Sequence, residues 1–304
     1  MKWNKWGLVY WPDTARWWSR SHAYLPTAEI VYSETIRVYF SSRDENQMGR
    51  IGYVDLDAED PKKILYVTSE PILDVGEFGS FDEYGVNPCC LINKGEEKLL
   101  YYFGWQKSIK SSYALFCGLA VSIDGGRTFN RYSKAPILDR TDREPFLRSS
   151  VSVIEDNGLF RMWYVSGAGW TEFNNKACPT YNIRYCESKD GYVWAPTDVV
   201  CVDFKSDDEF GFGRPWVIKD GSIYRMWYSI RRKYRPYCIG YAESSDGLEW
   251  IRRDEAVGIH RSEKGWDSEM ICFACIYDIN GKRHMLYNGN RHGAEGFGYA
   301  QFVE

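Results

Sequence analysis

Acidic residues recur at one position of a repeated pattern in this chain. Five short apolar segments start near residues 26, 88, 150, 215 and 274, and the residue about six positions earlier is acidic in four of them. The acidic residues are Asp82, Glu144, Glu209 and Glu269, and Arg20 stands at the remaining position. A pair of carboxylates can supply the acid and the base that cleavage of a glycosidic bond requires. We therefore interpret Glu269 as a general acid and Asp82 as a base or transition-state stabiliser.

Other polar and aromatic residues fall close to these acids in the repeated pattern. Asp267 precedes Glu269 by two residues, and His22 stands near the start of the first apolar segment. Carboxylates, amides and arginines can bind several hydroxyls at once, and a tryptophan face suits the apolar side of a sugar ring. We place Asp267 and His22 with the catalytic pair. The residues expected to bind substrate are Arg43, Asp44, Trp105, Glu144, Trp170, Glu209, Arg214, Arg231 and Asn290.

An internal repeat positions all of these residues. Met-Trp-Tyr occurs at 162–164 and 226–228, and looser copies start at residues 38, 100 and 285. The five copies are about 60 residues apart, which is typical of a repeat architecture. Each unit contains short strands separated by turn residues, with Asp-Gly hairpin signals at residues 124, 190 and 246.

The repeat predicts an all-β, five-bladed β-propeller with four-stranded antiparallel blades, forming one domain over residues 1–304. The last unit supplies three strands, so residues 7–10 are predicted to add its missing outer strand and close the ring. The alternative is a stack of independent domains, but about 60 residues of sheet cannot bury both faces alone.

This topology predicts which loops share a face. The first strand of each blade lines the axis, and the second runs antiparallel to it. The end of the second strand and the start of the first therefore lie at one mouth. We expect the Asp-Gly turns at Asp124, Asp190 and Asp246 on the opposite face, with a structural role.

Composition limits the partners that we expect. The net charge of −4 and the pI near 5.7 make nucleic acid an unsuitable partner. The apolar run after the first residues is too short for a leader, and no stretch predicts a membrane span. The chain has nine cysteines, an odd number. This count and the lack of a predicted leader favour free thiols and a cytoplasmic location. Cys272 and Cys275 have Cys-x-x-Cys spacing within a predicted strand, and we interpret them as buried residues. We expect no cofactor and assign no metal ligand, but several carboxylates meeting at the axis leave a metal ion there as an open alternative.

The five units, the acidic positions and segments such as residues 225–228 and 239–250 resemble the five-bladed propeller superfamily of arabinanases, invertases and levansucrases. Glycoside hydrolase families 43, 32 and 130 belong to it. Residues 21–23, 214–216 and 265–270 are also similar to uncharacterised bacterial proteins of surface-polysaccharide gene clusters. The resemblance implies an axial pocket for a small or oligosaccharide substrate.

One departure from the superfamily keeps three functions open. Its hydrolases place an Asp on the first blade, where this chain has Ser21-His22-Ala23. The first hypothesis is cleavage or transfer of a glycosidic bond. The second is a non-catalytic sugar-binding propeller, and the third is a sugar transferase or phosphorylase. In the third, Arg43, Arg214, Arg231 and Arg232 would bind a phosphate group.

Overall fold

The computed structural model describes residues 1–109, 111, 113–173 and 175–303, and β-strands dominate this part of the chain. Its two helical turns are η1 (Asp254–Ala256) and α1 (Asn290–Gly293), and neither could cross a membrane. The strands are β1 (Trp3–Tyr10), β2 (Ser21–Tyr32), β3 (Thr35–Arg43), β4 (Gly49–Asp57), β5 (Ile64–Val67), β6 (Gly85–Lys94), β7 (Glu97–Gln106), β8 (Ala114–Ser122), β9 (Asn130–Arg131), β10 (Arg148–Asp156), β11 (Leu159–Phe173), β12 (Lys176–Ser188), β13 (Ala195–Val202), β14 (Glu209–Asp220), β15 (Ile223–Arg232), β16 (Cys238–Ser244), β17 (Ile251–Arg252), β18 (Cys272–Ile279), β19 (Lys282–Asn288) and β20 (Phe297–Phe302).

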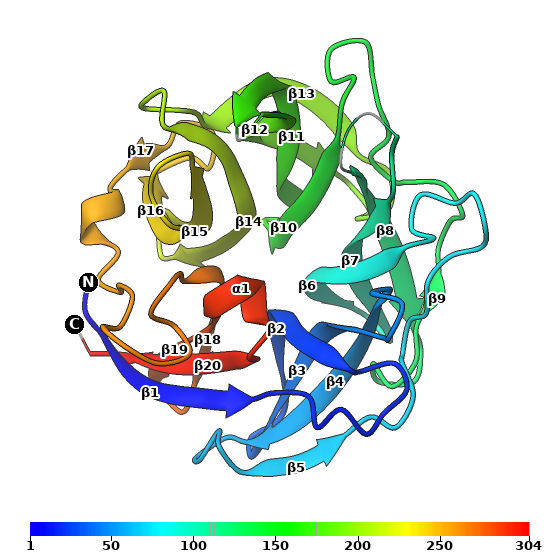
Figure 1. Ribbon diagram of the computed structural model, residues 1–304, viewed down its shortest axis with the longest axis vertical. Helices are drawn as coiled ribbons and strands as arrows, with labels where there is room; N and C mark the ends of the chain where they lie inside the picture. The colour runs from blue at the N-terminus through cyan, green and yellow to red at the C-terminus, as the bar shows by residue number, and fades with distance from the viewer. Residues whose placement is uncertain (110, 112, 174, 304) are drawn as a thin grey trace.

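Antiparallel pairing groups these strands into sets of four. The sets, numbered one to five here, are β2-β3-β4-β5, β6-β7-β8-β9, β10-β11-β12-β13, β14-β15-β16-β17 and β18-β19-β20-β1. Single parallel residue pairs join sets one to four in order. Figure 1 shows the sets arranged around a common centre, with the first strand of sets one to four nearest to it. The first strands therefore hold the residues that can meet at the centre.

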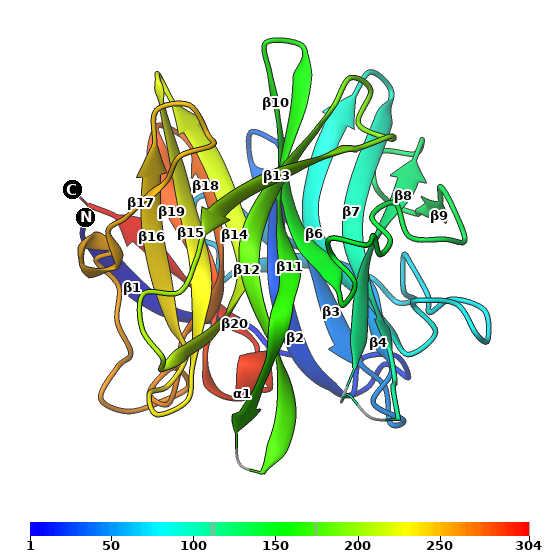
Figure 2. The same cartoon turned by 90° about the horizontal axis from the view of Figure 1, so that it is seen from above.

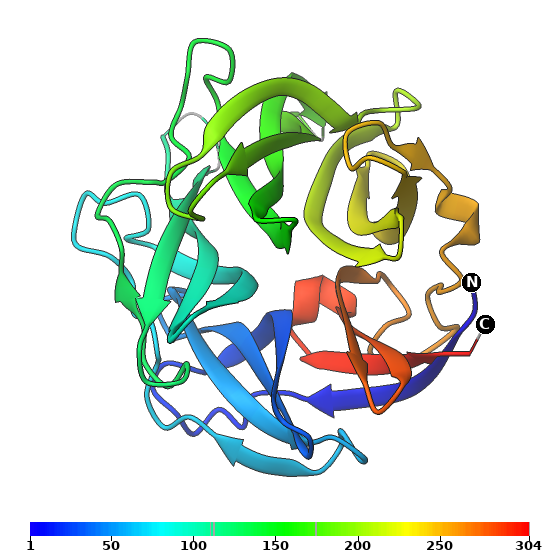
Figure 3. The same ribbon diagram turned by 180° about the vertical axis from the view of Figure 1, so that it is seen from behind.

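The N-terminal strand completes set five. Gly7, Leu8 and Tyr10 pair with Tyr299, Gly298 and Phe297 of β20, so the predicted position of residues 7–10 is confirmed. The three strands expected at the end of the chain are confirmed as β18, β19 and β20. The two termini lie side by side at the rim of the molecule (Figures 1 and 3).

Apolar side chains fill the space between neighbouring sets. Of five hydrophobic clusters, four join consecutive sets. The fifth joins set five to set one, and there Tyr10 packs between Phe40 and Phe297 at centroid distances of 5.0 and 5.7 Å. Most of the abundant aromatic residues serve this packing, as ring faces and edges fill the space between sheets.

The strand ladders confirm the predicted position of the Asp-Gly turns. Ser122, two residues before Asp124, pairs with Lys98 at the start of β7, whereas Trp105 near the end of β7 pairs with Leu115. The turn and Trp105 therefore lie at opposite ends of set two. The equivalent serines before Asp190 and Asp246 pair in the same way, Ser188 with Phe160 and Ser244 with Tyr224. Figure 2 shows α1 and the end of β11 together at one face of the molecule.

The first strand of each set begins earlier than the apolar segments predicted. The largest difference is in β14, which starts at Glu209 although the apolar segment starts at Pro215. Its pairing with β15 is interrupted between Gly213 and Trp216 and then resumes. A bulge allows a strand to continue through a residue that does not fit the regular ladder. The apolar pattern begins only after the bulge, so it did not reveal the first half of β14.

Candidate functional site

The same irregularity recurs in the first strand of every set. Register shifts interrupt the pairing of β2, β6, β10, β14 and β18 at equivalent places. Four residues at these shifts adopt a left-handed backbone, namely Leu25 (φ 58°), Ser150 (φ 46°), Arg214 (φ 49°) and Phe273 (φ 58°). Such a conformation costs on the order of 1–3 kcal/mol for a residue other than glycine, and it is concentrated at functional sites. A bulge also redirects the side chain.

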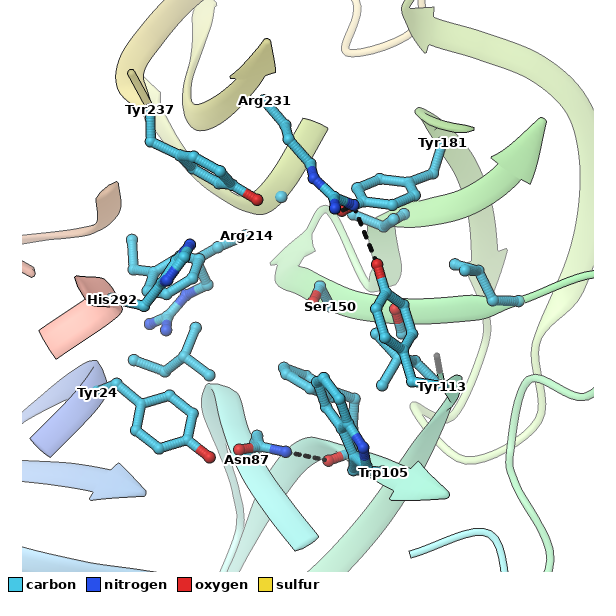
Figure 4. Close-up of a pocket in the computed structure, with 18 of the residues that line it drawn as sticks. Tyr24, Asn87, Trp105, Tyr113, Ser150, Tyr181, Arg214, Arg231, Tyr237 and His292 are labelled. Carbon is cyan, nitrogen blue, oxygen red and sulfur yellow. Dashed lines mark hydrogen bonds between the residues drawn. The ribbon is translucent and has the colours of Figure 1, made fainter. Parts of the chain in front are cut away.

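These four residues line a cavity where the sets converge. The cavity has a volume of about 270 Å³ and receives side chains from all five sets. Its walls are largely aromatic, with Tyr24, Trp105, Tyr113, Tyr181 and Tyr237 around the space (Figure 4). Trp105 and Tyr113 pack against each other with ring centroids 4.8 Å apart. Ligand sites are commonly apolar clefts of roughly 300–1,000 Å³ with a few polar groups, so this cavity suits a small ligand.

Three arginines line the cavity. Arg231 donates from Nη1 to the hydroxyls of Tyr113 (3.0 Å) and Tyr181 (2.8 Å). The guanidinium of Arg43 lies 5.3 Å from the centre of the Tyr24 ring. Arg214 is completely buried and donates from Nη2 to the Pro26 carbonyl (2.9 Å) and the Thr27 hydroxyl (3.0 Å). Among the described residues, none of the three forms an ion pair with a carboxylate within 4.0 Å, and no Asp or Glu lines the cavity.

Two histidines stand close to these arginines. His292 lines the cavity and contacts the Tyr237 ring at 4.8 Å, while His22 contacts the Tyr24 ring at 5.9 Å. Burial lowers the pKa of His22 to about 4, and the charges of Arg43 and His292 act in the same direction. Burial and the charges of Arg231 and Arg43 lower the pKa of His292 to about 4 as well. Both imidazoles are therefore neutral at pH 7.

Several buried polar atoms around the cavity lack a hydrogen-bond partner among the described residues. They are Oδ1 of Asn87, Oγ of Ser149, and Nε and Nη1 of Arg214. Buried polar atoms in folded proteins are nearly always satisfied by protein, water or ligand. Because the atoms are themselves buried, they place unbalanced polarity and charge directly behind the cavity wall. In the described part of the chain, no cluster of three or more His, Cys, Asp or Glu is arranged to hold a metal ion.

The recurrent carboxylates lie outside the cavity lining and are paired. Asp82 is 1% exposed and accepts hydrogen bonds from the Tyr102 hydroxyl (2.9 Å) and from Nε of Arg131 (2.8 Å). Glu144 accepts from the Tyr164 hydroxyl (3.0 Å) and pairs with Arg148 (3.1 Å). These contacts hold each acid within its own set and indicate a structural role.

The carboxylates of sets four and five are paired in a similar way. Glu209 receives two hydrogen bonds of 2.8 Å from Arg252, which lower its pKa although burial alone would raise it. Asp267 is buried, accepts from the Tyr287 hydroxyl (3.0 Å) and pairs with Lys5 (2.7 Å). Asp267, rather than Glu269, is therefore the set-five counterpart of Asp82.

One hydrogen bond explains why the acids recur in register. In sets two, three and five the acid binds the tyrosine in the third position of the repeated aromatic triplet. In set four the equivalent Tyr228 binds Asp254 (2.6 Å), which shares Arg252 with Glu209. Set one has Phe40 at this position and Arg20 in place of the acid. The tyrosine and the acid are thus present or absent together, as a structural pair would be.

The other residues predicted for the site are dispersed. Glu269 is exposed, and its backbone N–H donates to Asn290, whose side chain is thereby tied to the segment before β18. Asp44 is buried and pairs with Arg50 (2.6 Å). Trp170 is 46% exposed, and its ring lies 5.8 Å from the Phe146 ring in a separate pocket. Of the predicted set, the cavity brings together only Arg43, Trp105, Arg214 and Arg231, and His22 lies beside it.

Two curated proteins match almost the whole chain. Uncharacterized protein Rv1502 of Mycobacterium tuberculosis (strain ATCC 25618 / H37Rv) is 40% identical over 301 residues, which cover 99% of each chain. Uncharacterized protein MT1551 of Mycobacterium tuberculosis (strain CDC 1551 / Oshkosh) matches at the same identity and coverage. The chain belongs to the family of these mycobacterial proteins. No family model matches it.

Solved structures identify the fold of this family. A glycoside hydrolase aligns with a TM-score of 0.77 at 16% identity, covering 99% of this chain and 92% of its own. A thermostable family-43 glycoside hydrolase aligns with a TM-score of 0.70 at 17% identity, covering 93% of this chain and 91% of its own. The chain therefore has the all-β fold of the propeller glycoside hydrolases, as the resemblance of its sequence implied. A fold of this kind does not by itself fix the activity.

Sequence reasoning missed most of the cavity wall. Tyr24, Asn87, Tyr113, Tyr181 and Tyr237 come from different strands and loops with no shared position in the repeat. His292 stands two residues after Asn290, in the segment after β19 that the topology predicts at the mouth, but it is not among the site residues predicted from the sequence. The left-handed residues had one signal, since Leu25 and Arg214 each precede a proline that breaks the ladder.

Proposed function

We propose that this protein binds a carbohydrate in the axial cavity. The observation that supports this most directly is the aromatic wall formed by Tyr24, Trp105, Tyr113, Tyr181 and Tyr237. An aromatic face packs well against the apolar side of a sugar ring, and the hydroxyls of Tyr24 and Tyr237 in the same wall can bind its hydroxyls. The cavity thus has both kinds of contact that a sugar requires.

We further infer that the five strand sets are the blades of one closed propeller domain spanning residues 1–304. Two observations support this. Hydrophobic clusters join every pair of neighbouring sets, including the fifth and the first, and β1 serves as the outer strand of set five. Closure of this kind brings the first strand of each set to one axis, and the cavity lies at that axis.

Binding is better supported than hydrolysis by these side chains. Glycoside hydrolysis normally requires two carboxylates on either side of the scissile bond. No described carboxylate lines the cavity, and Asp82, Glu144, Glu209 and Asp267 are engaged with tyrosine, arginine or lysine. Cleavage or transfer of a glycosidic bond stays a prediction that depends on the exposed Glu269 near α1.

The binding proposal is tested by substitution in the aromatic wall. We expect Trp105→Ala to weaken binding of a sugar ligand about 10-fold or more, the effect of losing roughly 1.4 kcal/mol of contact. Trp11→Ala is the matched control because Trp11 is 59% exposed and outside the cavity. Affinities would be measured by titration calorimetry against a panel of mono- and disaccharides. Equal affinities for the parent and Trp105→Ala would contradict the proposal.

The same panel tests bond cleavage. If the parent protein turns over a glycoside, Glu269→Gln should lower the rate by about 100-fold or more and leave affinity intact, since that is the scale of a lost general acid. Unchanged turnover would remove Glu269 from the mechanism. No turnover by the parent, together with measurable affinity, would support a binding protein.

A further inference from the structure

Building on the proposed carbohydrate site, we propose that its ligand is an anionic sugar. Arg43 and Arg231 bind its carboxylate or phosphate in the cavity that the buried Arg214 also lines. All three arginines line one cavity, and they come from sets one and four. Carboxylates and phosphates are the groups that guanidinium binds best, through two parallel hydrogen bonds.

Arg231 is held in place but not neutralised. Two tyrosine hydroxyls fix its Nη1, and the Phe210 ring lies 4.4 Å from its guanidinium. A guanidinium has five N–H donors, and those on Nε and Nη2 make no hydrogen bond to the residues that the structure describes. The tyrosine contacts orient the group without supplying a negative charge, because burial keeps the pKa of Tyr113 above its usual value.

Arg43 faces the same space from set one. Its guanidinium packs near the ring of Tyr24, which is itself part of the cavity wall. Figure 4 shows Tyr24 and Arg231 on different sides of the cavity. A ligand between them could therefore meet positive charge from two directions.

Arg214 is the strongest evidence for an anion. It is 0% exposed, and its Nε and Nη1 have no partner among the described residues. The titratable groups that perturb it are the thiols of Cys275, Cys89 and Cys90, whose own pKa values burial raises, so they carry no charge. A buried cation without a counter-charge is strongly unfavourable, and burial accordingly lowers the pKa of Arg214.

The local charge also contrasts with the rest of the chain. The protein as a whole has 42 acidic and 38 basic residues, so it is slightly acidic. Other arginines of low exposure pair with acids, such as Arg37 with Asp55 and Arg252 with Glu209. The absence of carboxylates among the described lining residues is therefore specific to the cavity, and it creates a positive potential that attracts an anion.

The test compares sugars that differ only in charge. Calorimetry would measure binding of glucose against glucuronate, glucose 1-phosphate and glucose 6-phosphate, of galactose against galacturonate, and of inorganic phosphate alone. We expect at least one anionic sugar to bind 10-fold or more tightly than its neutral counterpart. A preferred sugar acid would identify a carboxylate ligand, and a preferred sugar phosphate would identify a phosphate ligand.

Substitution then assigns the preference to the arginines. Arg43→Gln and Arg231→Gln should each weaken the preferred anionic sugar about 10-fold or more and change binding of its neutral counterpart by less than 3-fold. Arg143→Gln is the control because it removes the same charge from an exposed position paired with Asp198. Circular dichroism and thermal melts would verify that each variant is folded.

The two proposals fail in different ways. Equal binding of neutral and anionic sugars, weakened by Trp105→Ala, would overturn the anion inference and leave the carbohydrate site standing. Binding of inorganic phosphate without any sugar, or of no compound in the panel, would overturn both. An anion preference that persists in the Arg43→Gln, Arg231→Gln double variant would also overturn the inference.

Discussion

At the scale of single residues, a repeated sequence signal here marks a structural contact. Asp82, Glu144 and Asp267 occupy equivalent positions because each accepts a hydrogen bond from the tyrosine of its own set. The sequence alone could show that the acids recur, but not which partner they meet. Catalytic residues differ from blade to blade, since a single site needs each of them once, so recurrence favours packing over chemistry.

Replacing Asp82 should therefore affect stability. We expect Asp82→Asn to lower the free energy of unfolding by roughly 2–4 kcal/mol, because it leaves the Arg131 charge without its partner. The value lies towards the lower end of the range for buried pairs since Arg131 is partly exposed. Urea denaturation would measure it. A variant with unchanged stability but without sugar binding or turnover would return Asp82 to the site.

The two histidines predict how stability depends on pH. His292 has a folded pKa of about 4, below the usual 6.5, so the unfolded chain takes up a proton at a higher pH than the folded chain does. Stability should therefore fall as pH decreases from about 6.5 to about 4. Removing this titration by His292→Gln should reduce the slope over that window, measured by denaturation at several pH values. An identical slope in parent and variant would show that His292 is protonated normally.

At the scale of elements, turns and strands have separate tasks. The Ser-x-Asp-Gly turns lie at the face opposite the cavity, where Asp124 accepts backbone hydrogen bonds from Arg127 and Thr128. Strand order and turn position could be predicted because they follow from apolar spacing and turn residues. The bulges of the first strands could be predicted only in part, because a proline follows Leu25 and Arg214 whereas no such signal follows Ser150 or Phe273. They place Ser150 and Phe273 in the cavity, so the site was less predictable than the fold.

Adjacent glycines in one turn give a matched test of how sets dock. Gly125 and Gly126 both have positive φ, but a Cβ on Gly125 would meet nothing, whereas one on Gly126 would lie 2.2 Å from the Tyr39 hydroxyl of set one. Gly125→Ala should cost about 1 kcal/mol in stability for its backbone alone. Gly126→Ala should cost a further 1–3 kcal/mol, roughly the cost of overpacking. Equal losses in chemical denaturation would show that this turn does not pack against set one.

At the scale of the whole molecule, β1 ties the beginning of the chain to its end. Trp3 belongs to the cluster between sets four and five, while Val9 and Tyr10 belong to the cluster between sets five and one. One strand of eight residues thus stabilises two interfaces. The spacing of the repeat predicted this arrangement because the last unit lacked a strand.

Loss of one side chain from β1 should be costly. Tyr10→Ala should lower the free energy of unfolding by about 3–5 kcal/mol, the usual effect of removing a large buried aromatic side chain. Trp6→Ala is the control on the same strand, and we expect a loss below about 1 kcal/mol because Trp6 is 49% exposed. Guanidinium denaturation would compare the two. If Tyr10→Ala lowered the free energy of unfolding as little as Trp6→Ala, Tyr10 would contribute little to the interface between sets five and one.

The bulges of the first strands also bear on how ligand selectivity can diverge. One backbone conformation presents leucine, serine, arginine and phenylalanine at equivalent places in four sets. This conformation therefore accepts apolar, polar, charged and aromatic side chains. Substitutions at residues 25, 150, 214 and 273 can alter the chemistry of the cavity while the same bulged backbone is kept. Natural variation and directed evolution of new sugar specificities should concentrate at these four positions.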